Sequence, residues 1–258
     1  MADIGASRAR LTACMRAAMR AAGRLVASVP AVLAPSRCRA CAAVLAAGPG
    51  AADAPWCDEC AALVVPLGEP FCLGCHTGWA TRTCRCPVPL ALLCAVQYGD
   101  PVAALVRDAK YEGWEPLLDV WLALWRATVG ADGVPTGPLP DLLCAVPTHP
   151  SRRRERGFAV PERWAARLAA HCGRPRVEAL TRVRATRPQV GLDRRWRGHN
   201  VHGAFAAGPD AAAVRGRSLA IVDDVVTSGA TVRESANLLR SLGARRVEVW
   251  SFAYEPIE

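Results

Sequence analysis

Residues 217–231, RSLAIVDDVVTSGAT, decide the fold of this chain. An apolar run at 219–222 contains β-branched residues and predicts a fully buried, parallel strand. Asp223 and Asp224 end the run, a turn of small and hydroxyl-bearing residues follows, and a helical pattern begins directly after the turn. This order predicts a turn at the carboxyl edge of an α/β sheet, where such sheets bind their ligands.

The turn carries groups that bind a phosphate. Free backbone N–H groups and the helix dipole favour an anion at a helix start, and a glycine lets the backbone approach it closely. Carboxylates repel a phosphate, so we expect the acid pair to contact ribose hydroxyls or Mg²⁺ instead. The predicted phosphate-binding residues are Thr227, Ser228, Gly229, Ala230 and Thr231.

The segment IVDDVVTSGAT resembles the motif with which type I phosphoribosyltransferases bind 5-phosphoribosyl-1-pyrophosphate (PRPP). The resemblance implies an α/β fold, with a type I phosphoribosyltransferase-like parallel sheet flanked by helices, and Mg²⁺ as the cofactor that accompanies PRPP. It leaves the acceptor substrate open. The alternative is a buried strand with a plain acidic turn, and two adjacent acids at a strand end argue against it.

The composition is that of a soluble globular protein. The 258 residues suit one medium domain or two small ones, with 52% hydrophobic and 21% charged residues. No apolar run approaches the ~20 residues of a membrane span. The net charge of +9 is concentrated, because residues 151–200 hold 14 arginines and four acidic residues. A polyphosphate ligand or a nucleic-acid backbone would each account for such a segment.

Residues 1–36 are rich in alanine and arginine and predict an amphipathic, N-terminal helical extension. A signal peptide is the competing interpretation. Ser28 and Pro30 interrupt its apolar region, however, and a cysteine cluster follows directly. We therefore expect a cytoplasmic protein.

Eight cysteines then fall in four close pairs. Two-residue spacing places two thiolates on one metal ion, and two pairs complete a tetrahedral set, so structural zinc is favoured over disulfides. The simplest pairing gives two zinc sites, while interleaved pairs or one occupied site also satisfy the spacing. His76 is an alternative ligand, although we interpret it as an exposed neighbour of Cys75. The predicted ligands are Cys38, Cys41, Cys57 and Cys60, and Cys72, Cys75, Cys84 and Cys86.

Pro87-Val88-Pro89 predicts a linker, so we expect a zinc-binding module at 37–88 and a phosphoribosyltransferase-like domain at 89–258. In that domain the patterns predict strands at 92–98 and 142–146 and helices at 101–111 and 116–129. Trp121 and Trp125 have helical spacing and are expected in the core.

An arginine-rich segment, VPTHPSRRRERGF, follows the strand at 142–146. Its arginines are predicted to lie on a loop before a helix that begins near Pro161, a position suited to hold pyrophosphate. A solvated basic patch is the alternative. The later segment LTRVRATRPQVGLDRRWRGHNVHGAF is long and basic, and it predicts a mobile lid beside the site.

Taken in order, five features resemble the ComF family over about residues 25–254. They are the cysteine pairs, KYEG, VPTHPSRRRERGF, the pattern R-x-T-x-x-Q-x-x-L…R-x-x-N-V-x-G-A-F, and IVDDVVTSGAT. The resemblance implies that Asp223, Asp224 and the turn bind PRPP. It also implies a pyrophosphate loop and a lid, formed by Arg152, Arg154 and Arg156, and by Arg184, Thr186, Gln189, Arg197 and Asn200.

ComF proteins are associated with DNA uptake in natural transformation, so the resemblance implies a phosphoribosyltransferase linked to that process, with other DNA-uptake proteins as partners. One feature departs from the family. Ala159 and Val160 follow RGF where the family usually has Asn-Gln. The alternative function is a non-catalytic, zinc-containing adaptor that binds single-stranded DNA in the competence machinery. The acid pair discriminates between the two, because DNA binding does not require it.

Overall fold

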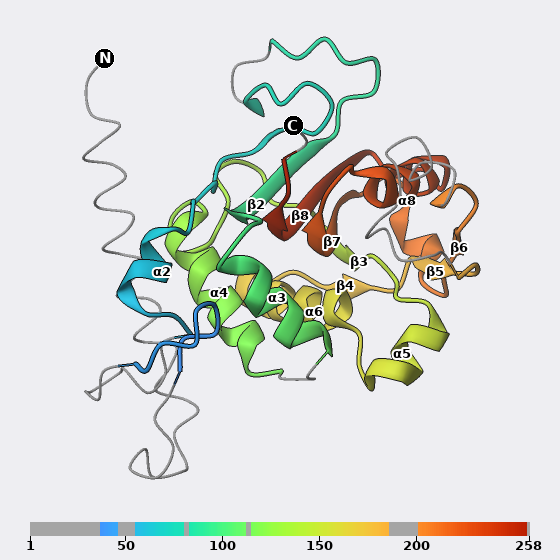
Figure 1. Ribbon diagram of the computed structural model, residues 1–258. Helices are drawn as coiled ribbons and strands as arrows, with labels where there is room; N and C mark the ends of the chain where they lie inside the picture. The colour runs from blue at the N-terminus through green and yellow to red at the C-terminus, as the bar shows by residue number, and fades with distance from the viewer. Residues whose placement is uncertain (1–36, 46–54, 80–82, 112–114, 186–200, 257–258) are drawn as a thin grey trace. The chain divides into compact units, whose positions relative to one another are not determined.

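The computed structural model describes residues 37–45, 55–79, 83–111, 115–185 and 201–256 (Figure 1). The chain divides into two units, Met1–Gly68 with Ala95–Thr136, and Glu69–Cys94 with Gly137–Glu258. The expected extension at 1–36 lies outside the described residues, and the expected domain boundary at residue 88 stays a prediction. The two units each contain one of the two cysteine sets.

A six-stranded sheet of mostly parallel strands carries the candidate site. Its strand order is β1-β2-β8-β7-β3-β4, and the pairs β7–β8, β3–β7 and β3–β4 are parallel, as predicted, while β1–β2 is antiparallel. Figure 1 shows β8, β7 and β3 lying side by side. The strands span Phe71–Cys72 (β1), Ala91–Gln97 (β2), Leu142–Ala145 (β3), Arg176–Val177 (β4), Ser218–Val226 (β7) and Arg246–Tyr254 (β8).

Strand β7 is buried along almost its whole length, as its apolar run predicts. The prediction that the acid pair ends this strand is wrong. Asp223 pairs with Ser251 of β8, and the ladder continues to Val226, which pairs with Tyr254. The strand is longer because β8 provides backbone partners beyond the acids, and sequence alone cannot reveal a partner strand's length.

Two helices pack against these strands, α6 (Val160–Cys172) against β7 and β3, and α8 (Ala230–Ser241) against β7 and β8. Trp164 of α6 is fully buried and meets Phe252 edge to face, with 6.3 Å between ring centroids. Val232, Ala236 and Leu239 form the buried stripe of α8. A separate antiparallel pair joins β5 (Leu180–Arg182) and β6 (Phe205–Ala207), and a short 3₁₀ helix, η3, spans Ala211–Val214.

The first unit contains the short helix α2 (Asp58–Ala62) and the helices α3 (Val102–Tyr111) and α4 (Leu117–Thr128). The observed bounds of α3 and α4 agree with the predicted helices to within a residue at each end. Trp121 and Trp125 are fully buried, so their predicted place in the core is confirmed. The indole N–H of Trp125 donates to the carbonyl of Gly133 at 2.8 Å.

The arginine segment is a helix, α5 (Pro150–Arg156), and the prediction of a loop there is wrong. The ring Nδ1 of His149 accepts a hydrogen bond from the Ser151 N–H, Pro150 occupies the first turn, and Gly157 ends the helix with a φ of 80°. These start and stop signals, together with the helical propensity of arginine, outweigh the loop expected from the strand connection.

Candidate functional site

The turn after β7 leads directly into α8. Gly229 occupies the N-cap position in the left-handed region, with φ 74°, and has no side chain to cap the helix. The hydroxyl of Ser228 accepts a hydrogen bond from the N–H of Ala230 at 3.5 Å. The first N–H groups of a helix have no partner within the helix, so they are available to an anion. A depression of about 20 Å³ lies at this place, which is shallow enough that a ligand would rest on it and extend outwards. Its lining includes Asp223, Thr227, Gly229, Ala230 and Thr231.

The acid pair is largely buried, with Asp223 9% and Asp224 8% exposed. Asp223 Oδ1 accepts a hydrogen bond from the N–H of Asp224 at 2.9 Å, and Asp224 Oδ1 accepts one from the N–H of Val225 at 2.7 Å. Asp223 shares the depression with the turn, whereas Asp224 is not part of its lining. The structure thus brings one of the two predicted acids to the predicted phosphate-binding residues.

Helix α5 holds the predicted pyrophosphate-binding arginines. Arg152 is half-buried and Arg154 is exposed, while the side chain of Arg156 lies outside what the structure describes. The preceding loop is fixed by Glu162, whose carboxylate accepts hydrogen bonds from the N–H of Thr148 at 3.0 Å and from its hydroxyl at 3.1 Å. Glu162 therefore holds the loop that connects β3 to α5.

Arg182 is a candidate site residue that sequence reasoning missed. It lies on β5 with its guanidinium carbon 5.4 Å from the centroid of the Phe205 ring. Burial, and then the positive charge of Arg152, lower the pKa of Arg182, while the carboxylate of Asp223 raises it. Arg182 thus shares an electrostatic neighbourhood with both an arginine of α5 and the acid pair. The sequence gives no signal for it, because it is one of many arginines in the same stretch.

Arg184 is the one predicted lid residue that the structure describes, and its guanidinium donates to the carbonyl of His202. The other predicted lid residues, Thr186, Gln189, Arg197 and Asn200, lie outside the described residues. Ala159 and Val160, which stand where the family usually has Asn-Gln, are both buried, with 4% of each residue exposed.

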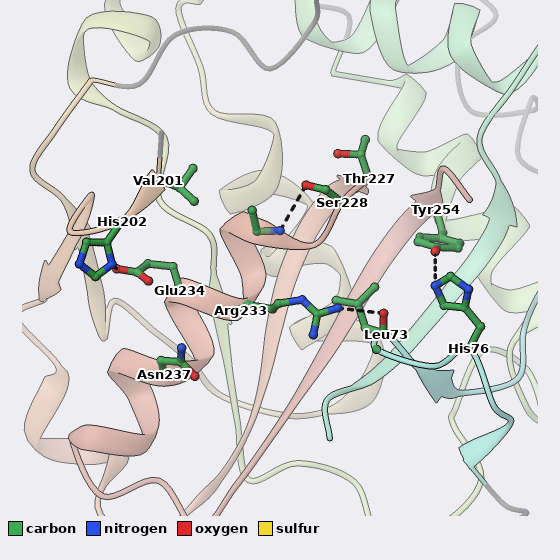
Figure 2. Close-up of a pocket in the computed structure, with 12 residues that line it drawn as sticks. Leu73, His76, Val201, His202, Thr227, Ser228, Arg233, Glu234, Asn237 and Tyr254 are labelled. Carbon is green, nitrogen blue, oxygen red and sulfur yellow. Dashed lines mark hydrogen bonds and ion pairs between the residues drawn. The ribbon is translucent and has the colours of Figure 1, made fainter. Parts of the chain in front are cut away.

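A larger pocket of about 410 Å³ lies along α8 and shares Thr227 and Ala230 with the depression (Figure 2). Its lining includes Leu73 and His76, from the hairpin at residues 71–78 of the second cysteine set, and Tyr254 at the end of β8. Figure 2 shows Arg233 reaching across from α8 to the carbonyl of Leu73, and His76 facing Tyr254. No pattern in the sequence indicates that the cysteine hairpin borders the turn.

The eight cysteines form two sets of four, and the simplest predicted pairing is the one observed: Cys38, Cys41, Cys57 and Cys60, and Cys72, Cys75, Cys84 and Cys86. All eight are free thiols. Sulfur atoms are 3.7 Å apart in the Cys41–Cys57 pair, 3.8 Å in Cys72–Cys86 and 3.6 Å in Cys75–Cys84. Zn–S bonds of about 2.3 Å give a tetrahedron with edges of about 3.8 Å. Each set can therefore hold one zinc ion.

His76 is not part of either set. Its Nε2 lies 2.9 Å from the hydroxyl of Tyr254, and its ring meets that of Phe71 edge to face. Its backbone has a φ of 57°, in the left-handed region. The interpretation of His76 as a neighbour of the ligands is thus favoured over its role as a ligand.

Within each cysteine set, some thiols have a lowered pKa and others have a raised pKa. Burial by itself raises the pKa of Cys72, but the backbone N–H groups of Cys75 and Gly74 lower it, and the pKa falls to about 6. Burial and backbone N–H groups oppose each other in the same way at Cys38, whose pKa also falls to about 6. Hydrogen bonding with Cys75 raises the pKa of Cys86 to about 12. Zinc binds thiolates, so metal binding would release protons from these sets.

The chain is similar to several known proteins. The model of a phosphoribosyl transferase domain matches residues 164–258. The DNA utilization protein YhgH of Escherichia coli O6:H1 is 36% identical over 162 residues, which cover 62% of this chain and 70% of that protein. YhgH of Salmonella typhi is 34% identical over 197 residues, 75% of this chain and 82% of that protein.

Competence protein F of Haemophilus influenzae is 30% identical over 161 residues, 60% of this chain and 69% of that protein. The chain belongs to the ComF family. Among solved structures, adenine phosphoribosyltransferase from Thermoanaerobacter pseudethanolicus is 14% identical with a TM-score of 0.33, covering 76% of this chain and 98% of that chain. Glutamine PRPP amidotransferase from B. subtilis is 19% identical with a TM-score of 0.31, covering 47% of this chain and 28% of that chain. Within the described part of the ComF-family chain, no helix combines the length and the apolar character that a bilayer crossing requires.

Proposed function

We propose that this ComF-family chain is a Mg²⁺-dependent phosphoribosyltransferase that binds PRPP in the cytoplasm and serves DNA uptake. The observation that carries the proposal is the shared depression in which Asp223 meets the turn at 227–231. Arg182 lies within electrostatic reach of both Asp223 and Arg152, so acidic and guanidinium groups flank one place on the sheet edge. A sugar that carries a phosphate at one end and a pyrophosphate at the other needs both kinds of group.

Each part of PRPP has a counterpart in the chain. The 5-phosphate rests on the backbone N–H groups of the turn and on the hydroxyls of Thr227 and Thr231. The acid pair holds the ribose hydroxyls or Mg²⁺. The pyrophosphate lies toward Arg152, Arg154 and Arg156, and Arg182 stabilises the same charge from β5.

Catalysis in this proposal is mainly positioning and charge stabilisation. The bond between the anomeric carbon and the pyrophosphate oxygen breaks, and its electron pair leaves with pyrophosphate. The acceptor's lone pair forms the new bond to the same carbon, and the acceptor loses its proton to solvent. The arginines stabilise the charge that develops on pyrophosphate, and the turn keeps the sugar in place. Mg²⁺, when bound, supplies further positive charge to the leaving group.

Isothermal titration calorimetry with PRPP and Mg²⁺ tests the binding step. The wild-type chain is expected to bind, and the double variant Asp223→Asn with Asp224→Asn is expected to show no heat of binding. A matched control, Asp119→Asn with Asp132→Asn, makes the same chemical change in the first unit and is expected to bind like the wild type. Equal PRPP binding by wild type and the acid-pair variant would refute the site. Release of pyrophosphate in a screen of acceptors then tests turnover.

The exposed arginines of α5 support a second candidate function, binding of single-stranded DNA by a non-catalytic adaptor. Arg153 and Arg154 are both exposed on this short helix. Contacts with DNA phosphates release counterions, so affinity would fall steeply with salt. In this alternative the acid pair has no role.

Fluorescence anisotropy with a labelled single strand, measured from roughly 50 to 200 mM salt, separates the two functions. An adaptor loses affinity when Arg153 and Arg154 are replaced by glutamine, and keeps it in the acid-pair variant. Binding that does not change with salt, or that is absent, would exclude the adaptor function.

A further inference from the structure

The hairpin of the second cysteine set contacts the phosphate-binding turn, although the two are more than 150 residues apart in the sequence. Leu73 and Gly74 are the two residues between the ligands Cys72 and Cys75, and both line the pocket beside the turn. Leu73 is 3% exposed, so its side chain is packed rather than solvated. The segment that a bound zinc ion would fix is therefore also a wall of the turn.

Two contacts join the hairpin to the turn. A Cβ added to Gly229 would lie 2.5 Å from Cδ2 of Leu73, which shows how closely that side chain packs on the turn's glycine. On the next turn of α8, the guanidinium of Arg233 donates to the carbonyl of Leu73 at 2.9 Å. One residue of the hairpin thus touches the start of α8 through both its side chain and its backbone (Figure 2).

The hairpin's own conformation depends on its cysteines. Cys72 Sγ accepts a hydrogen bond from the N–H of Gly74 at 3.4 Å, and the N–H of His76 donates to the carbonyl of Cys72 at 2.8 Å. A Cβ on Gly74 would lie 2.7 Å from Cys86 Sγ, so the opposite cysteine pair packs directly on the hairpin. Loss of the metal would remove the tetrahedral constraint on these sulfurs, and Leu73 would no longer be held against Gly229.

We propose that Leu73 and Arg233 are positioning residues that couple zinc at Cys72, Cys75, Cys84 and Cys86 to ligand binding at the phosphate-binding turn. The inference rests on the proposed PRPP site. Zinc holds the hairpin, the hairpin holds Gly229 in its left-handed conformation, and the backbone of the turn is then aligned for the phosphate. The zinc set of the first unit has no part in this coupling.

Coupling between two sites is reciprocal, so the two changes in affinity can be measured and compared. The factor by which zinc tightens binding of a sugar phosphate must equal the factor by which the sugar phosphate tightens zinc. Couplings of this kind are typically about 5- to 150-fold. The probes are PRPP and ribose 5-phosphate, because ribose 5-phosphate reaches the turn without needing the arginines.

The experiment measures zinc release to a chromogenic chelator from the full chain, with and without each probe. Release from two sets is expected, and the probes are expected to slow release from only one of them. The variant Cys41→Ser with Cys57→Ser removes the first set's zinc and assigns the slowed release to the second set. Calorimetry on zinc-loaded and partly depleted protein gives the reciprocal effect on probe affinity.

Arg233→Met tests the positioning role, because it keeps the apolar stem and removes the bond to Leu73. A matched control is Arg246→Met, which removes an equivalent bond of 2.7 Å from a guanidinium to the carbonyl of Pro138. Arg233→Met is expected to abolish the difference in PRPP affinity between zinc-loaded and depleted protein, and Arg246→Met to preserve it. If Arg233 instead bound the phosphate directly, its loss would lower the PRPP affinity of zinc-loaded and depleted protein by the same factor. Leu73→Ala should reduce the coupling and Leu73→Met should restore it.

The outcomes separate this inference from the function on which it rests. No PRPP binding by zinc-loaded protein overturns the proposed function and the coupling together. PRPP binding of equal affinity in loaded and depleted protein, or probes that leave both zinc release rates unchanged, overturns the coupling alone. Unequal affinity that survives in Arg233→Met and Leu73→Ala excludes these two residues as the connection.

Discussion

At the scale of single residues, the turn predicted to bind phosphate depends on the conformational freedom of Gly229. Gly229 has a φ of 74°, which an L side chain rarely adopts, and the space for its Cβ is filled by Leu73. Gly157 at the end of α5 has a similar φ of 80° with open space around the Cβ position. The two positions therefore separate backbone strain from side-chain collision.

Gly229→Ala is expected to destabilise the chain by about 1–3 kcal/mol and to weaken PRPP binding, because strain and the collision with Leu73 add together. Gly157→Ala is expected to show the strain alone. Urea denaturation of both variants measures the difference. Equal destabilisation of the two would mean that Leu73 does not pack tightly on the turn.

Glu248 on β8 gives a prediction of pH dependence. Burial raises the pKa of its carboxyl, Arg246 lowers it by a smaller amount, and the carboxylate accepts a hydrogen bond from Trp250 at 2.8 Å. A raised pKa in the folded state means that the folded chain binds more protons than the unfolded chain between the two pKa values. Stability therefore falls as the pH rises through this window.

Glu248→Gln removes this ionisation and keeps an oxygen acceptor for Trp250. The melting temperature of the variant is expected to exceed that of the wild type at about pH 7.5, with a smaller gap at about pH 4, where the wild-type carboxyl is largely protonated. Thermal unfolding at both pH values measures the gap. A gap that is larger at the lower pH would contradict the assigned direction of the pKa shift.

At the scale of elements, the packing of α6 beneath the sheet keeps β3 and β7 in place for the site. Trp164 is its fully buried anchor. Trp164→Ala is expected to lower the free energy of unfolding by about 3–5 kcal/mol, because it leaves a large cavity. Trp79→Ala, at a side chain that is 40% exposed, is the matched control and should lower it much less. Similar losses in denaturant titrations of the two variants would contradict the assigned role of α6.

At the scale of the whole molecule, the two cysteine sets belong to different units, and each set is tied to its own unit by an arginine. In the first unit, Arg39 lies between Cys38 and Cys41 and forms an ion pair of 2.8 Å with Asp108 of α3. In the second unit, Arg233 of α8 donates to Leu73. Zinc at either set is therefore expected to stabilise the unit that contains it.

Elemental analysis is expected to find two zinc ions per chain, and one in the variant Cys41→Ser with Cys57→Ser. Structural zinc contributes about 10–16 kcal/mol of binding free energy in small zinc domains, so a chelator should lower the melting temperature of the wild type. Limited proteolysis of the variant should expose cleavage sites in the first unit only. Cleavage in the second unit as well would show that the first set supports both.

The sequence predicted the elements well where a local pattern defines them. The strand at 219–222 and the helix that bears Trp121 and Trp125 follow from hydrophobic periodicity and end signals. The errors have different causes. The end of β7 depends on its pairing with β8, which no pattern in the sequence states. Helix α5 follows from local signals, the cap by His149 and the stop at Gly157, which the expected loop left out of account.

By itself, the sequence determined the parallel sheet, the turn after β7 and the grouping of eight cysteines into two sets of four, because each follows from residue types at short, fixed spacing. Only the tertiary structure decided that Arg182 lies near Asp223 and that the hairpin of Leu73 packs against Gly229 and Arg233. Such contacts join residues far apart in the chain. They arise from how the strands pair and how side chains fill the space between them, and no spacing in a single sequence encodes that.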